Sequence, residues 1–207
     1  MKILCIHGTG SNGTIMQMQI AALRYELEDG HEYDFVEAVA PAPMSEDVAS
    51  LASPDQDFYA FYHPVTYGGL RQAIDHLDAF VTAEGPYDAV MGFSAGSVLA
   101  ALYLLETQQK GTGMRAMPFR YGLFFSSAKS KEAMSSLGID PNSEAIQIPT
   151  IHIWGDKDEM EPTGGKDLSQ ICLASRRTIL VHEGGHEFPR DMSLTKAVHA
   201  IRRTFSN

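Results

Sequence analysis

One segment organises the rest of this chain, and it reads Asp88-Ala89-Val90-Met91-Gly92-Phe93-Ser94-Ala95-Gly96-Ser97-Val98-Leu99. Its apolar residues 89–91 predict a short buried strand, and residues 95–105, rich in Ala and Leu, predict a helix. Between the two lies Gly92-x-Ser94-x-Gly96, the pattern of a nucleophile elbow, in which a strand reverses into a helix at a strained serine. Side chains two positions before and after that serine would collide, so glycine is needed at both. The segment predicts a serine hydroxyl raised above a sheet, beside a helix N-terminus.

Strands and helices alternate along the remainder of the chain. Apolar runs predict strands at residues 2–6, 35–39, 89–91, 121–125, 150–154 and 178–181, and helical spacing predicts helices near residues 20–27, 69–81, 95–105, 164–174 and 194–205. This alternation predicts one α/β domain over residues 1–207, with about six mostly parallel strands flanked by helices. Residues 41–63 carry prolines and an aromatic cluster and predict a long irregular connection, and residues 110–113 predict a loop.

Composition narrows the class of protein. The net charge of −10 and the hydrophobic fraction of 44% are those of an acidic globular protein. We expect neither nucleic acid nor a membrane as the main partner, because both are polyanionic. The two cysteines, Cys5 and Cys172, are too few for a disulfide framework. The chain shows no signal-peptide pattern and no apolar run of membrane-spanning length, so we expect a cytoplasmic, enzyme-sized domain.

The candidate catalytic residues follow the predicted strands, because parallel α/β sheets form their sites at the carboxyl ends of the strands. Ser94 needs a histidine to take its proton, and that histidine needs a carboxylate to hold its tautomer. The order serine, acid, histidine along a chain is that of α/β-hydrolases. The candidate acids are Asp156, Asp158, Glu159 and Glu161, and we expect Asp158, because a glycine turn precedes it, with Asp156 as the alternative. We expect His186 as the base, because it follows a Gly-Gly turn, with His182 as the alternative.

A tetrahedral intermediate at Ser94 also needs hydrogen-bond donors for its oxyanion. The N–H of Ala95 is expected to be one, since it follows the nucleophile. The glycine-rich turn after the first strand is expected to supply the other, from Thr9 or alternatively Gly10. We also expect residues 41–63 to overhang the serine as a small lid, although their aromatic side chains could instead anchor the segment to the core. The predicted substrate-pocket residues are Gly10, Phe58, Tyr59, Phe61, Tyr62 and Met160.

Neither a metal nor a cofactor is expected. His182 and His186 are four residues apart, but Gly184-Gly185 interrupts the helix that a zinc pair of this spacing requires. The glycine-rich turn at residues 8–13 has neither the dinucleotide-binding glycine pattern nor the lysine of a P-loop.

Five motifs recur in one order in a known family, and the resemblance extends over residues 2–205. They are Ile3-Leu4-Cys5-Ile6-His7-Gly8, Tyr67-Gly68-Gly69-Leu70, Gly92-Phe93-Ser94-Ala95-Gly96, Gly155-Asp156-Lys157-Asp158 and Gly184-Gly185-His186. Together they resemble the fungal family of serine hydrolases, which includes hydrolases like the ovarian tumour suppressor candidate. The resemblance implies an α/β-hydrolase fold without a large cap domain. This chain departs from the family at Ala95, where many relatives carry Gln, but the chemistry needs only the N–H of this residue.

The resemblance also implies a reaction. Members of the family hydrolyse carboxyl esters or thioesters, and several release polyketides from synthases in secondary metabolism. We therefore expect a serine hydrolase with a small-molecule acyl ester or thioester as substrate, and an acyl-carrier protein as a candidate partner. Two alternatives stay open: an acyltransferase that uses the same acyl-enzyme, and a non-catalytic ligand binder on the same fold. An intact set of Ser94, Asp158 and His186 favours catalysis, since a binder has no need of all three.

Overall fold

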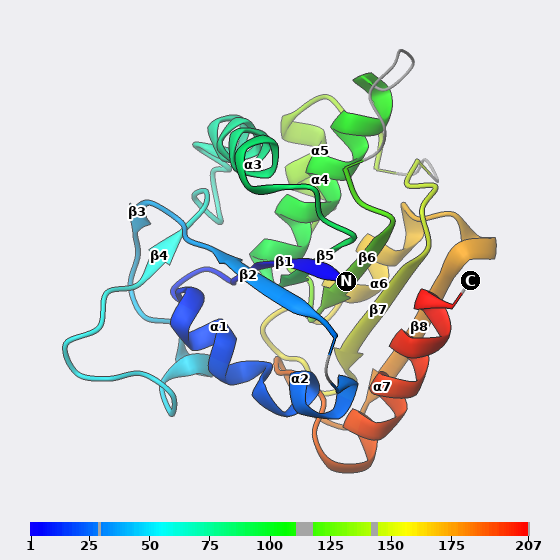
Figure 1. Ribbon diagram of the computed structural model, residues 1–207. Coiled ribbons are helices and arrows are strands. Elements are labelled where there is room, and N and C mark those ends of the chain that lie inside the picture. Colours follow the sequence, from blue (N-terminus) through cyan, green and yellow to red (C-terminus); the bar gives the residue numbers. More distant parts are fainter. Residues whose placement is uncertain (29, 111–117, 142–144, 207) are drawn as a thin grey trace.

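The computed structural model describes residues 1–28, 30–110, 118–141 and 145–206, and its centre is a six-stranded sheet (Figure 1). Every pair of neighbouring strands in this sheet is parallel, and the strand order is β2-β1-β5-β6-β7-β8. The strands are β1 (Lys2–Ile6), β2 (Glu32–Val36), β5 (Ala89–Phe93), β6 (Tyr121–Phe125), β7 (Thr150–Gly155) and β8 (Arg177–His182). Such a sheet brings the carboxyl ends of all its strands to one edge.

Helices cover both faces of the sheet (Figure 1). One face carries α3 (Leu70–Glu84), α4 (Ala95–Lys110), α5 (Lys131–Ser136) and α6 (Gly164–Gln170), and the other carries α1 (Gly13–Gln19), α2 (Ala21–Leu27) and α7 (Asp191–Phe205). Alternate residues of each central strand enter opposite cores: Leu4 and Ile6 join the first, Ile3 and Cys5 the second. Burial on both faces explains why the central strands are uniformly apolar in sequence. The chain has the α/β-hydrolase architecture, and among the residues that the structure describes no cap domain stands over the sheet.

Several predicted elements differ in their bounds from the observed ones: the helix predicted near residues 164–174 ends at Gln170, for example, and the one predicted at residues 95–105 continues to Lys110. The edge strand β2 runs over Glu32–Val36 and not 35–39, because Glu37 lies beyond the strand and accepts a hydrogen bond from Gly13 N–H at 3.1 Å. The helix predicted at residues 20–27 is the second of two short helices, α1 and α2, which meet at Ile20. The predicted loop at residues 110–113 lies almost wholly outside the described residues. Among the helices described, none is long and apolar enough to cross a bilayer.

Residues 41–63, which we call the wall segment, are held in place by backbone hydrogen bonds. Their ends form β3 (Ala40–Pro41) and β4 (Tyr59–Ala60), which pair antiparallel, and a short 3-10 helix, η1, spans Glu46–Val48. Gly10 donates its N–H to Tyr59 O at 2.9 Å and accepts from Ser45 N–H at 3.0 Å. These bonds tie the segment to the turn after β1, and its action as a small lid stays a prediction.

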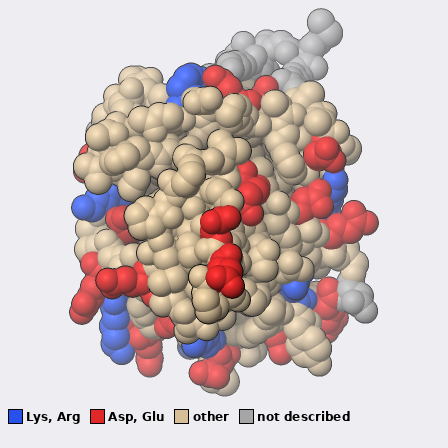
Figure 2. Space-filling model, turned by 90° about the vertical axis from the view of Figure 1, so that its left-hand side faces the viewer, with Lys and Arg blue, Asp and Glu red and all other residues tan. Residues whose placement is uncertain are grey.

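Surface charge follows the composition. Acidic side chains outnumber basic ones on the face that Figure 2 shows, as the net charge of −10 leads one to expect. A face of this kind repels polyanions.

Candidate active site

Ser94 occupies a sharp turn that connects β5 to α4. Its φ of 53° lies in the left-handed region, which is strained for a residue with a side chain. A Cβ added at Gly96 would stand 2.2 Å from Ile6 O, and one at Gly92 would stand 2.5 Å from the Cα of Ser97. Only glycine fits at either position, for the steric reason that the sequence pattern predicts. The strain is held by tertiary packing, because the elbow lies directly against the end of β1.

Backbone hydrogen bonds fix the elbow from the other side as well. Ser94 donates its N–H to Phe125 O at 3.0 Å, and its carbonyl accepts from Ser97 N–H at 3.0 Å and from Ala128 N–H at 3.2 Å. The neighbouring β6 therefore determines where the serine stands. Such rigid support is what holds a nucleophile in place without reorganisation.

Asp158 and His186 come from the loops that follow β7 and β8. Their side chains are 3% and 5% exposed, and His186 Nδ1 lies 2.7 Å from Asp158 Oδ2. The other carboxylate oxygen accepts the Glu161 N–H at 2.9 Å. A histidine that donates Nδ1–H to a carboxylate presents Nε2 as a proton acceptor. His186 and Ser94 line the same cavity, of about 610 Å³, which we call the catalytic cavity.

The loops that follow β7 and β8 approach each other so closely that only glycine fits at position 155. A Cβ on Gly155 would stand 2.1 Å from Gly184 O. The turn that precedes Asp158 and the Gly-Gly turn that precedes His186 are therefore packed against each other. This contact explains how two residues 28 positions apart reach hydrogen-bond distance.

The alternative acid and base stand elsewhere. Asp156 is exposed, and its N–H donates to His182 O at 2.8 Å. His182 is buried, its Nδ1 accepts from Gly184 N–H at 3.2 Å, and burial lowers the pKa of its ring. Neither residue lines the catalytic cavity. The structure thus brings Ser94, Asp158 and His186 to one place and leaves the alternatives outside it.

The predicted oxyanion donors also border the catalytic cavity. Thr9 and Ala95 line it together with Ser94, and within the described residues neither of their N–H groups has a hydrogen-bond acceptor. Gly10 does not line it, and its N–H is already donated to Tyr59 O. A Cβ on Gly8 would lie 3.1 Å from Ser94 Cβ, so this turn passes directly beside the nucleophile. The geometry favours Thr9 over Gly10 as the second donor.

A contact between buried His7 and half-exposed Glu37 supports the same turn, and no pattern in the sequence indicated it. His7 is fully buried; its Nδ1 lies 2.8 Å from Gly8 O and its Nε2 lies 2.9 Å from Glu37 Oε1. Burial raises the pKa of Glu37, but hydrogen bonds from His7 and from Gly13 N–H outweigh it and leave this pKa below its ordinary value. The pair fixes the path of the chain on both sides of the histidine. No local motif announces it, because Glu37 follows a different strand.

The predicted pocket residues divide into two groups. Tyr62 and Met160 line the catalytic cavity, whereas Phe58 and Tyr59 line neither it nor the adjoining hollow described next. That hollow, the side cavity, has about 370 Å³ and contains Phe61 and Tyr62. Residues that sequence reasoning missed in the catalytic cavity are Pro43, Ser45, Pro64, Val65, Tyr67, Ala128, Lys129 and Glu132; Glu161, a candidate acid, lines it as well. Ala128 and Lys129 follow β6, so the rule that sites lie at strand ends could have predicted them. No comparable rule points to Pro43 and Pro64.

Glu161 is the most perturbed charged group in the catalytic cavity. Its Oε2 is buried and, within the described residues, has no hydrogen-bond partner. Burial raises its pKa, while the positive charge of Lys129 and the backbone N–H of that residue oppose the rise.

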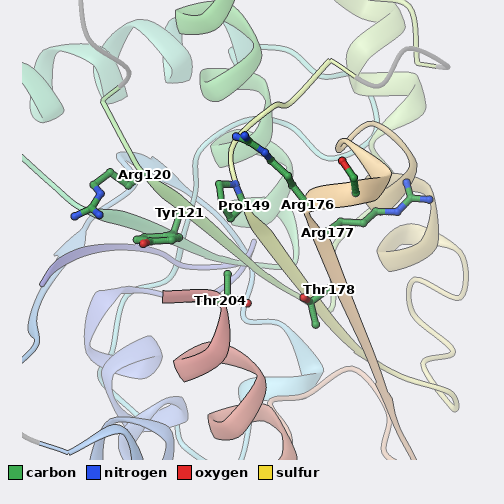
Figure 3. A pocket seen from close by; sticks show the side chains of 8 residues that line it. Arg120, Tyr121, Pro149, Arg176, Arg177, Thr178 and Thr204 are labelled. Atoms are coloured by element: carbon green, nitrogen blue, oxygen red, sulfur yellow. The ribbon is translucent and has the colours of Figure 1, made fainter. Parts of the chain in front are cut away.

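Another hollow lies away from the carboxyl ends of the strands. Its volume is about 480 Å³, and the residues that line it include Arg120, Arg176 and Arg177 (Figure 3). The three guanidinium groups point in different directions in Figure 3, and Arg177 is bonded to Ser169 O at 2.7 Å. The three guanidinium groups do not converge on one point, so they do not form a binding site for an anion. Within the described residues, no group of three His, Cys, Asp or Glu side chains is placed to hold a metal ion.

Comparison with known proteins agrees with this geometry. Residues 1–198 match the family model described as "Serine hydrolase (FSH1)". "Esterase FPY3" of Fusarium mangiferae is 32% identical over 92% of this chain and 89% of its own length, and "Hydrolase phiM" of a fungal species is 26% identical over 97% and 92%. Among solved structures, esterase PE8 superposes with a TM-score of 0.63 at 21% identity, covering 98% of this chain and 92% of that one. At that identity the structural likeness speaks for the fold alone. The family match over nearly the whole length, on a sheet with a nucleophile elbow, shows that this chain belongs to the FSH1 serine hydrolase family.

Proposed function

We propose that this protein is a carboxylic ester hydrolase that works through an acyl-enzyme on Ser94, with His186 as general base and Asp158 as the group that orients it. The observation that carries the proposal is the buried 2.7 Å contact between His186 Nδ1 and Asp158, in the same cavity as a serine held at φ 53°. The strained backbone of Ser94 and the buried contact between His186 and Asp158 both cost stability, and catalysis is a use that accounts for both. Relatives that are named as esterases support the reaction class.

The proposed reaction has two halves. Ser94 Oγ attacks the ester carbonyl carbon, and His186 Nε2 takes the hydroxyl proton. The bond between the carbonyl carbon and the alkoxy oxygen then breaks, and the histidine gives its proton to the departing alcohol. Water repeats the sequence on the acyl-enzyme: the histidine takes its proton, the carbon–Oγ bond breaks, and Ser94 recovers its hydrogen. An acid product and an alcohol leave, and the enzyme returns to its starting state.

The oxyanion that forms in both halves would accept hydrogen bonds from Thr9 N–H and Ala95 N–H. A lost donor of this kind typically costs about 3–4 kcal/mol of transition-state stabilisation. The N-terminus of α4 adds a favourable dipole at the same point.

The same chemistry extends to thioesters, and we include them in the proposed substrate class, together with a thioester delivered on an acyl-carrier protein. A thiolate leaves in place of an alkoxide, and no other group is needed. We also propose that the protein acts in the cytoplasm, which fractionation of the native host would test, and in secondary metabolism, as the resemblance implies. Transfer of the acyl group to an acceptor other than water would use an identical first half.

The test is covalent labelling combined with turnover. A fluorophosphonate should label the parent chain, and Ser94→Ala should neither label nor turn over p-nitrophenyl esters. Ser97→Ala is the matched control, because that serine is buried nearby and bonded to Phe125 O, outside the catalytic cavity. Labelling of Ser94→Ala at the parental rate would refute the assignment. A parent that binds esters without releasing acid would favour the ligand-binding alternative, and acyl transfer to an added alcohol would identify a transferase.

A further inference from the structure

One carboxylate contacts both ends of the turn that carries the proposed oxyanion donor Thr9. Glu37 Oε1 lies 2.9 Å from His7 Nε2, and Glu37 Oε2 accepts the Gly13 N–H at 3.1 Å. Glu37 follows β2, which lies directly beside β1 in the sheet, whereas the turn follows β1. The Glu37 side chain is 47% exposed and lines neither the catalytic cavity nor the side cavity. It can therefore act on the reaction through this turn, and not by touching the substrate.

The peptide group between Gly8 and Thr9 connects this contact with the reaction. Its bond is trans, so Gly8 C=O and Thr9 N–H point in opposite directions. His7 Nδ1 lies 2.8 Å from Gly8 O, which can only accept a hydrogen bond, so the ring donates Nδ1–H to it. Thr9 borders the catalytic cavity, and within the described residues its N–H has no acceptor. The histidine thus holds one end of this peptide group and fixes the direction of the donor at the other.

The surroundings of the His7 ring leave it little freedom. The side chain is fully buried, and the Phe61 ring packs against it with the two centroids 4.7 Å apart. A doubly protonated ring donates Nε2–H to Glu37, whereas a neutral ring with its hydrogen on Nδ1 accepts the Ala38 N–H at 3.2 Å. Both forms keep the Nδ1–H bond to Gly8 O, and the tautomer with hydrogen on Nε2 alone loses it. The ring therefore holds the Gly8 carbonyl in either charge state.

Resting on the proposed function, we propose that Glu37 is a positioning residue for the oxyanion site: through His7 and Gly13 it holds the turn so that Thr9 N–H is aimed at the oxyanion. Three of the seven residues 7–13 are glycine, which leaves the backbone free to adopt other conformations. Without the carboxylate, the peptide group that bears the donor can rotate and withdraw its N–H. The loss falls on the charged transition state and not on the binding of the uncharged substrate.

The test measures how tightly a Glu37→Ala variant binds an oxyanion. A butyl trifluoromethyl ketone is the probe: Ser94 Oγ adds to its carbonyl carbon, the serine proton passes to His186, and the ketone oxygen becomes the oxyanion. In Glu37→Ala its inhibition constant should rise about tenfold, a part of the 10²–10³-fold effect of a wholly lost donor, while KM for p-nitrophenyl acetate stays within about twofold. An inhibition constant does not depend on the fraction of active enzyme, so it separates positioning from a loss of folded protein.

Two further variants sharpen the test. Glu37→Gln should recover most of the parental affinity for the ketone, because an amide accepts the Gly13 N–H and donates to Nε2 of a neutral His7. Glu32→Ala is the matched control and should equal the parent, since Glu32 is an exposed residue of β2 that lines neither cavity.

Three outcomes would overturn the inference. They are a parental inhibition constant in Glu37→Ala, an inhibition constant that rises there together with KM, and equal losses in Glu37→Ala and Glu37→Gln. Fluorophosphonate labelling of the parent tests Ser94 independently. A parent that labels, combined with an unchanged inhibition constant in Glu37→Ala, keeps the proposed function and loses the role of Glu37.

Discussion

The strand-end loops and the wall segment both border Ser94, yet they are built in different ways. Ser94, Asp158 and His186 each follow a strand of the sheet, and glycines that tolerate no Cβ fix the turns that carry them. The wall segment has little regular structure and is held by long-range backbone bonds to Gly10. The first region places reacting groups, and the second shapes the cavity. The difference separates the chemistry from the choice of substrate, and four experiments test this separation.

The largest effect is expected at the base. His186→Asn should lower kcat/KM for esters by on the order of 10⁴-fold, because Ser94 loses its proton acceptor. His182→Asn should stay close to the parent, since His182 follows the same strand without lining the catalytic cavity. Steady-state kinetics on p-nitrophenyl acetate decide the matter. A larger loss of kcat/KM in His182→Asn than in His186→Asn would show that His182 is the general base.

The next effect concerns the sheet beneath the strand-end loops. His152 is buried in β7, and burial lowers its pKa to about 3. Below about pH 6.5 the unfolded chain binds a proton at this histidine and the folded chain does not, so the free energy of unfolding falls as the pH falls towards 3. Between about pH 7 and pH 4 this group removes roughly 3 kcal/mol.

Urea unfolding at the two pH values measures this contribution. His152→Met should lose roughly 3 kcal/mol less than the parent over that range, because methionine does not titrate. Equal losses in the two proteins would mean that His152 titrates alike in the folded and unfolded chains.

Glycine substitutions compare the two regions directly. Gly96→Ala should lower the free energy of unfolding by about 3 kcal/mol, since the new methyl group would meet Ile6 O at 2.2 Å. Gly68→Ala, beside the wall segment, meets nothing nearer than Thr66 Oγ1 at 3.3 Å, the end of a side chain that can move. It should change the same free energy by less than about 0.5 kcal/mol. Thermal unfolding measures both changes in the free energy of unfolding. Similar losses in the two variants would show that the elbow is no less tolerant of a methyl group than the turn beside the wall segment.

The smallest effect tests the tie between the regions. Ser45→Pro removes the N–H that bonds Gly10 O, at a residue whose φ of −76° suits proline. The free energy of unfolding should fall by about 1 kcal/mol relative to Ser45→Ala, which keeps the N–H and loses only the hydroxyl bond to Asp47. Equal free energies of unfolding in the two variants would show that the hydrogen bond from Ser45 N–H to Gly10 O does not stabilise the wall segment.

Local sequence carried most of the fold and the reacting residues. Continuous apolar runs mark the central strands because both of their faces are buried, and β6 matches its predicted bounds of 121–125. The edge strand β2 was misplaced because its residues are half-exposed and lack such a run. The nucleophile elbow could be read from three residues, since its steric demand is local.

Parts of the site that depend on distant contacts could not be read in this way. The pairing of His7 with Glu37 joins two strands, and Pro43 and Pro64 border the catalytic cavity only because the wall segment is bonded to Gly10. The aromatic cluster was a poor guide for the same reason: Phe58 and Tyr59 are in it, yet only Phe61 and Tyr62 reach a cavity. Composition shows that a segment is irregular and not which of its side chains faces inward.

The two hydrogen bonds at Gly10 have a consequence for the loop that they enclose. They anchor the wall at Ser45 and Tyr59, so the intervening residues 46–58 form a loop whose two ends are fixed beside the donor at Thr9. Loop closure is insensitive to length, with each doubling costing only about 0.6 kcal/mol. Insertions between the two anchors should therefore cost little closure entropy and leave the turn that carries Thr9 in place. The two anchors thus make the position of the catalytic turn independent of the length of this loop.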